Sequence, residues 1–176
     1  MQMQKSFVAC LTTSVLFVAF LCVGCSAQQT EEQALQSLRQ MTKDGKLPSE
    51  GVVENIETRF AGKKTGALAR LLRARIKFEN KDFAGAAATL NSDVFAKQTK
   101  VADYALWLRG RALQQSGSHT EAMAVFERLI REFPDSTRIA EARIYWADSA
   151  IASGKAAGVA TLFSDVPGKL SAASLV

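Results

Sequence analysis

The sequence predicts an all-α fold in which antiparallel helix hairpins stack as a short α-solenoid. Three observations carry this prediction: apolar residues recur with helical periodicity, turn-forming residues separate the helices, and the pattern repeats along the chain. We expect an export signal over 1–27 and a helical repeat domain over 28–176. The repeat domain divides into an N-terminal helix pair (28–66), three repeats (67–101, 102–136 and 137–166) and a tail (167–176).

The clearest predicted helix lies in the second of these repeats. Ser118 with Glu121 three residues later fits a capping box at its start. Pro134 disfavours helical geometry at the residue before it, and Asp135 and Ser136 are cap candidates for the next helix. The apolar residues of the helix form one stripe, as an amphipathic helix requires: Ala122, Val125, Phe126, Leu129, Ile130 and Phe133.

Helices are expected on both sides of this one. Apolar spacing predicts them over about 31–41, 52–60, 68–78 and 83–90, with turns between them. Residues 91–100 read as a longer connection before the helix that begins near residue 102. The last hairpin follows residue 136, and Pro167 with Gly168 ends it.

Residues of matching size recur 36 and then 37 positions apart, which predicts a repeat. Small residues would recur where two helices approach closely, and larger apolar residues where a stripe fills the space between neighbours. Segment 60–70 likewise resembles segment 133–143, 73 positions later. Four columns keep this register: Ala69, Ala105 and Ala142; Ala74, Gly110 and Ala147; Ala86, Ala122 and Val159; Leu90, Phe126 and Phe163.

The central hairpin resembles a tetratricopeptide repeat, and this resemblance extends over about 50–166. The Gly, Gly, Ala, Phe and Pro positions of such a repeat are matched by Gly110, Gly117, Ala122, Phe126 and Pro134. The departures are a period above the usual 34, Leu129 in place of a frequent Ala, and Trp107 one place from the usual aromatic. The resemblance implies a right-handed superhelix whose surface binds a protein or peptide partner.

A narrower resemblance concerns proteins of the bacterial envelope. The segments ALARLLRARI, YALWLRGRAL and FERLIREFPDS are similar to the superhelical region that precedes the catalytic domain of soluble lytic murein transglycosylases. They are also similar to repeats of periplasmic and outer-membrane assembly lipoproteins. The transglycosylases place their catalytic acid in a Glu-Ser motif, and no Glu-Ser dipeptide occurs here. Two functions follow: a non-catalytic envelope scaffold, or the N-terminal superhelical portion of such an enzyme without its catalytic domain.

The first residues have the layout of an export signal. Lys5 precedes an apolar run over 7–23, and small residues follow. A retained membrane anchor is the rival interpretation, although the run is slightly short for a membrane span. Cys25 after Gly24 resembles the site at which bacterial lipoproteins are cut and acylated, and ordinary cleavage after Ala27 is the alternative. We therefore expect a periplasmic protein held at the membrane by a lipid on Cys25.

The sequence of the repeat domain shows no pattern of catalytic, metal-binding or cofactor-binding residues. All three cysteines lie in the leader, and His119, expected in a turn, is the single histidine, so the usual zinc sites are excluded. The sequence contains no phosphate-binding glycine loop, and no pair of carboxylates is set in an apolar context. A net charge of +5 is mild and argues against a polyanion or nucleic-acid specialist. We expect no catalytic residue, no cofactor and no metal.

Four arginines form the candidate partner groove. Arg73 and Arg109 are 36 positions apart, as are Arg75 and Arg111, so each pair would stack on adjacent repeats. The first helices of the hairpins line the concave groove of tetratricopeptide-like stacks, where these arginines would clamp a carboxylate or an acidic peptide. The expected partner is a protein or peptide, and peptidoglycan-associated proteins are among the candidates. The alternative is a solvated, salt-bridged helix face.

The chain after Phe163 lacks a recognisable capping unit with a polar outer face. We therefore expect the last hairpin to meet a partner or a second copy of the chain, or to continue into a longer superhelix. Trp107 and Trp146 are expected in the core or between repeats.

Overall fold

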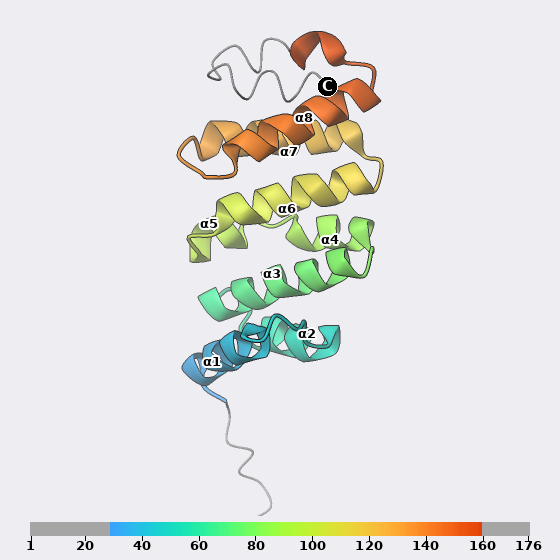
Figure 1. The fold of residues 1–176 in the computed structure, drawn as a ribbon. Coiled ribbons are helices and arrows are strands. Elements are labelled where there is room, and N and C mark those ends of the chain that lie inside the picture. The colour runs from blue at the N-terminus through green and yellow to red at the C-terminus, as the bar shows by residue number, and fades with distance from the viewer. Residues whose placement is uncertain (1–28, 160–176) are drawn as a thin grey trace, which may run out of the picture. The chain divides into compact units, whose positions relative to one another are not determined.

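The computed structural model describes residues 29–159, and the chain is all-helical there (Figure 1). From Glu31 onward the described residues belong to one compact unit, and the other unit, Met1–Thr30, lies almost wholly outside the described residues. The helices are α1 (Glu31–Thr42), α2 (Glu50–Arg59), α3 (Lys64–Glu79), α4 (Phe83–Leu90), α5 (Val94–Gln98), α6 (Ala102–Gln115), α7 (His119–Glu132), α8 (Ile139–Ala152) and a 3-10 helix, η1 (Ala156–Gly158).

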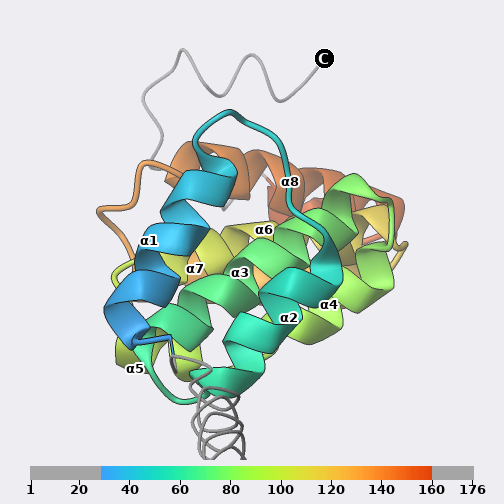
Figure 2. The same cartoon turned by 90° about the horizontal axis from the view of Figure 1, so that it is seen from below.

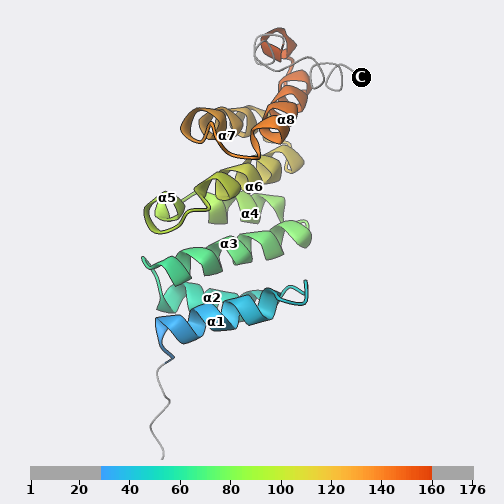
Figure 3. The same ribbon diagram turned by 60° about the vertical axis from the view of Figure 1, so that its left-hand side comes forward.

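Each long helix of the repeats packs on the one before it in the chain. The packed pairs are α2 with α3, α3 with α4, α4 with α6, α6 with α7, and α7 with α8. Helix α1 contacts α3, and Figure 2 shows α1 and α2 in front of the helices that follow. The short α5 lies beside α6 and also contacts α3 (Figure 3). This arrangement confirms the predicted α-solenoid of helix hairpins.

The apolar core is divided among neighbouring helices. One cluster joins α1, α2 and α3, a second joins α3 to α6, and a third joins α4, α6, α7 and α8. Phe78, Trp107 and Phe133 pack against both the second and the third cluster. Stability therefore comes from interfaces between successive helices, as in other repeat proteins.

The repeating columns of the sequence lie at these interfaces. Ala69, Ala105 and Ala142 are all buried, and so are Ala74, Gly110 and Ala147. Ala86 and Ala122 are fully buried, and Val159 packs against the third cluster. Leu90 and Phe126 are buried as well, whereas Phe163 lies outside the described residues. Pro134 follows the end of α7.

The predicted capping box at α7 is wrong. Ser118 occupies the N-cap position, but its side chain accepts no hydrogen bond from the helix. Its hydroxyl lies instead 3.5 Å from that of Ser116. The N-cap of α4 shows the bond that α7 lacks, since the Asp82 carboxylate accepts from the backbone N–H of Gly85 at 2.9 Å.

Three further local predictions need correction. Residues 91–100 contain the short helix α5 rather than only a connection. Helix α8 begins at Ile139 with Arg138 at its N-cap, so neither Asp135 nor Ser136 caps it. Ser136 instead accepts from the backbone N–H of Arg138 at 3.2 Å and thereby shapes the turn before the helix. His119 is the first residue of α7, so it begins a helix instead of lying in the turn.

Candidate partner-binding surface

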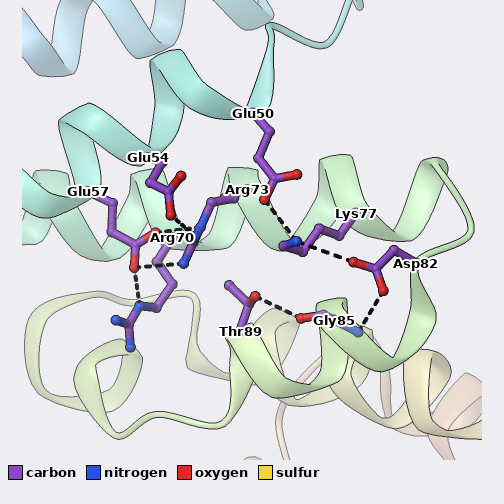
Figure 4. A network of polar contacts seen from close by, with 9 residues as sticks. All are labelled: Glu50, Glu54, Glu57, Arg70, Arg73, Lys77, Asp82, Gly85 and Thr89. Carbon is purple, nitrogen blue, oxygen red and sulfur yellow. Dashed lines mark hydrogen bonds and ion pairs between the residues drawn. The ribbon is translucent and has the colours of Figure 1, made fainter.

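Arg73 belongs to an ion-pair network that joins α2 to α3 (Figure 4). Its Nη1 donates to Glu54 at 2.6 Å, and its Nε lies 2.8 Å from Oε2 of Glu57, an ion pair without hydrogen-bond geometry. Arg70 donates to the other oxygen of Glu57 at 2.7 Å. Glu57 is buried, so the two arginines compensate a carboxylate that would be unfavourable there alone. In this conformation Arg73 stabilises the packing of α2 on α3.

Lys77 extends the polar contacts along the same side of α3 (Figure 4). Its Nζ lies 2.9 Å from Glu50 of α2 and 3.2 Å from Asp82 before α4. The hydrogen bond with Glu50 raises the pKa of Lys77, and Asp82 adds to the effect. The backbone N–H of Gly85, followed by Lys77, lowers the pKa of Asp82. One lysine thus connects three successive helices.

An aromatic–arginine cluster forms where α6 meets α8. It comprises Tyr104, Trp107, Arg111, Arg138 and Tyr145. Nη1 of Arg111 donates to the Tyr145 hydroxyl at 2.7 Å, and its guanidinium carbon lies 4.1 Å from the centre of that ring. Arg138 lies 4.5 Å from the ring centre of Tyr104 and 4.9 Å from that of Trp107. Arginines held over aromatic faces form a half-buried surface of defined shape.

Two further bonds hold the helices around this cluster. The hydroxyl of Ser136 donates to Asp103 at 2.6 Å, which joins the turn before α8 to the start of α6. The indole Nε1–H of Trp146 donates to Glu127 of α7 at 2.8 Å. Trp146 is buried in the third apolar cluster, whereas Trp107 packs at its edge. Both tryptophans therefore contribute to packing between helices.

Arg109 lies on a different side of α6, in a pocket beside α5. The α5 pocket has a volume of about 200 Å³ and is lined by residues of α4, α5, α6 and α7. Leu90, Phe95 and Ala105 give it an apolar floor, and Arg109, Arg128 and Glu132 give it charge. Burial lowers the pKa of Arg109, and the neighbouring Arg128 lowers it further, while Glu121 opposes both effects. The α5 pocket thus combines apolar and charged side chains.

The four arginines of the predicted groove therefore do not meet at one point. Arg73 pairs with α2, Arg109 lines the α5 pocket, and Arg111 contacts α8. Arg75 is exposed, and within the described part of the chain it pairs only with Glu79 of its own helix, at 3.9 Å. Arg73 and Arg75 are two positions apart on one helix, as are Arg109 and Arg111 on the next. Residues at this spacing point to nearly opposite sides of a helix, so neighbouring arginines face different partners. A groove that uses all four stays a prediction.

Sequence reasoning missed Arg128, Arg138, Tyr104 and Tyr145. Tyr104 and Trp107 are three positions apart, the spacing at which helical side chains become neighbours, and this was the one available signal. In the sequence, Arg128 with Glu132 four residues later is typical of a solvated helix face. The structure does show this ion pair, at 3.0 Å. Its place in the pocket follows only from the packing of α6 on α7.

The described part of the chain contains neither a metal-binding cluster nor a membrane-spanning helix. Within residues 29–159, no group of three or more His, Cys, Asp or Glu side chains is arranged to hold a metal ion. Over the same residues, no helix is sufficiently long and apolar to span a membrane.

Comparison with known proteins places one segment in a family. Residues 104–136, which cover most of α6, all of α7 and the turn after it, match the tetratricopeptide repeat family. No curated protein and no solved structure gives a significant match to the chain. The α6–α7 hairpin is thus a tetratricopeptide-type repeat, and repeats of this type generally mediate contacts between proteins.

Proposed function

We propose that this protein is a non-catalytic scaffold of the bacterial cell envelope that binds a protein or peptide partner through its helical repeats. The observation that carries the proposal is the tetratricopeptide-type hairpin at residues 104–136. Its neighbours on both sides, α4 and α8, pack on it as successive units of a solenoid. A stack of this kind presents a rigid, extended surface, which suits recognition of another chain.

The envelope location rests on the first 27 residues. The apolar run that follows Lys5 has the layout of an export signal, and Cys25 has the context of a lipoprotein acylation site. After lipoprotein-type cleavage Cys25 would be the N-terminal residue, and more than one acyl chain on it would hold an exported domain at a membrane surface. The proposed mature protein is therefore a lipid-anchored repeat domain in the periplasm, with the outer membrane as its expected location.

A labelling experiment tests this location. The full chain, tagged at its C-terminus and expressed in a Gram-negative host, is labelled with an alkyne analogue of palmitate, and membrane and soluble fractions are compared. We expect label on the membrane-bound chain and none on the Cys25→Ser variant. Cys22→Ser, which changes a neighbouring thiol of the leader, should keep the label. An unlabelled wild-type chain that remains in the cytosol would contradict the envelope proposal.

A second candidate function is the superhelical portion of a lytic transglycosylase without its catalytic domain. The likeness of ALARLLRARI and FERLIREFPDS to that enzyme region favours it. Reading the coding sequence beyond Val176 discriminates the two proposals. Continuation into a lysozyme-like segment with a Glu-Ser motif would support the enzyme, and a stop codon would support the scaffold.

A further inference from the structure

An acid-free basic segment runs from the end of α2 along most of α3. Between Glu57 and Glu79 the sequence has seven basic residues and no acidic one. The last four lie on α3 and have carboxylate partners at 2.6 to 3.9 Å, most of them on α2. The positive charge that these pairs leave unbalanced is therefore at the turn between the two helices. It belongs to Arg59, Lys63 and Lys64, which we call the basic turn.

The three side chains of the basic turn are exposed and close together. The guanidinium carbon of Arg59 lies 5.7 Å from the ring centre of Phe60, and Nζ of Lys63 lies 5.9 Å from it. Among the described residues, Arg59 and Lys64 form no ion pair, and Lys63 pairs only with Glu31, at 3.6 Å. An ion pair between exposed side chains is weak. The turn therefore keeps positive charge at the surface.

The start of α3 adds to this positive charge. The N-terminal end of a helix carries a partial positive charge, which acidic residues or a capping side chain usually offset. Helix α3 has no acidic residue in its first turn, and the side chain of its N-cap, Lys63, forms no capping bond. Glu31 and Glu32 at the start of α1 oppose the basic turn, but they leave it with an excess of positive charge.

The basic turn lies beside the start of the repeat domain, where the proposed anchor is attached. Through the pair of Lys63 with Glu31 it contacts the first residue of α1. Cys25 and Glu31 are six positions apart in the sequence, a length of chain that spans at most about 22 Å. A lipid on Cys25 would thus keep the basic turn within a short distance of the bilayer surface.

We propose that the basic turn docks on the anionic phospholipid surface that holds the lipid anchor. Each Lys or Arg near such a surface strengthens binding about fivefold, so three would hold an untethered domain only weakly. The anchor makes docking an intramolecular step, for which weak attraction suffices. A bilayer fits better than an acidic protein, because the anchor keeps it within reach at all times. The inference rests on the proposed function, since it takes the N-terminal anchor from it and adds the face that meets the membrane.

Fluorescence of the anchored chain on vesicles tests the docking. A polarity-sensitive fluorescent amino acid replaces Ala61, an exposed residue of the turn, or Ala124, an exposed residue of α7. The full chain is expressed with its leader, purified from membranes, and added to vesicles of phosphatidylcholine alone or with an equal part of phosphatidylglycerol. We expect a blue shift from position 61 on the anionic vesicles only, reversed by high salt, and none from position 124.

The matched variants each remove two positive charges from a turn. Arg59→Gln with Lys64→Gln changes the basic turn, and Lys43→Gln with Lys46→Gln changes the turn between α1 and α2, where both lysines are exposed. We expect the first pair to lower the equilibrium constant for docking on anionic vesicles at least about tenfold, and the second pair to change it little. Arg59→Lys with Lys64→Arg keeps the charges and should dock like the wild type.

Each contrary result has a definite meaning. No shift from position 61 on the anionic vesicles, or an equal shift on the neutral ones, would overturn the docking while the lipid anchor, read from the label on Cys25, stands. Equal losses in the two Gln pairs would show that net charge, and not the basic turn, holds the domain. A shift on neutral vesicles that needs added poly-glutamate would assign the turn to an acidic protein.

The anchor itself is judged separately. A chain without label that its leader still tethers would refute the acylation alone, because the docking test needs only an anchored N-terminus. A chain found in no membrane fraction would overturn both proposals.

Discussion

Gly110 of α6 and Phe126 of α7 approach so closely that no side chain fits between them. A Cβ atom built on Gly110 would lie 2.5 Å from Cε1 and 2.6 Å from Cζ of the Phe126 ring. The ring is fully buried among neighbours and has little space into which to move. The distance between the two helices of the hairpin is therefore set by the absence of a side chain at position 110.

Gly110→Ala should destabilise the protein despite the better helix propensity of alanine. We expect the free energy of unfolding to fall by about 1 to 3 kcal/mol, because the added methyl group overpacks the hairpin. Gly51→Ala is the control, since a Cβ at Gly51 of α2 meets nothing within 4 Å. That change should be neutral or should stabilise by up to about 1 kcal/mol. Urea unfolding followed by circular dichroism measures both, and an unchanged midpoint for Gly110→Ala would refute the close contact.

Arg73→Ala should weaken the fold more than Arg75→Ala. Removal of Arg73 leaves Glu57, whose side chain is 10% exposed, with Arg70 as its one partner, so we expect a loss of about 1 to 3 kcal/mol. Arg75 is 53% exposed and forms a long ion pair, which limits its effect to less than about 0.5 kcal/mol. Thermal melts of both variants provide the comparison. Equal melting temperatures would show that the network adds nothing to stability.

Tyr145→Phe tests the contact between α6 and α8. The change removes the hydroxyl that accepts from Arg111 at 2.7 Å but keeps the ring beneath the guanidinium. We expect a loss of about 1.5 to 3 kcal/mol, the usual value for one hydrogen bond to a charged group. Tyr145→Ala should cost more, since the ring contact with Phe126 is lost as well. If both variants have the melting temperature of the wild type, the contacts of the aromatic–arginine cluster do not stabilise the packing of α6 against α8.

The N-cap of α4 should make stability depend on acid. The pKa of Asp82 is lower in the folded protein than its ordinary value of 3.8, so its contribution is complete above that value. The contribution is lost as the pH falls through the lowered pKa. Asp82→Asn keeps a capping oxygen without a charge and should therefore flatten this part of the acid unfolding curve. Parallel curves for the two proteins between pH 5 and pH 2 would contradict the assignment.

The sequence predicted the fold more completely than the candidate site. Alanine and glycine columns reveal the helix faces that pack together, because a fixed period brings equivalent residues to equivalent interfaces. The five residues of α5 are too few to show helical periodicity, so the sequence did not predict the helix that forms one wall of the α5 pocket. The capping prediction failed for another reason. Asp82 and Ser118 both occupy N-cap positions, but only the Asp82 side chain accepts a hydrogen bond from a backbone N–H of its helix.

Contacts between α6 and α8 also lay beyond sequence reasoning. The distance from Arg111 to Tyr145 depends on how α6 and α8 are each rotated about their axes where they pack on α7. The sequence of a single helix does not determine that rotation. The same rotation separates Arg109 from Arg111 and brings Arg109 to the α5 pocket. Side-chain partners across helices are thus a product of packing.

Site-specific photo-crosslinking in cells tests the central claim, that the repeats bind a partner chain. A photoreactive amino acid is placed at exposed positions of the first repeat helices, Arg75 of α3 and Gln115 of α6, and at Asp44, in the turn between α1 and α2, as a control. The account predicts a discrete adduct of defined mass from Arg75 or Gln115, absent when the photoreactive residue is at Asp44. No adduct from either repeat position, in cells that contain the folded chain, would contradict the claim.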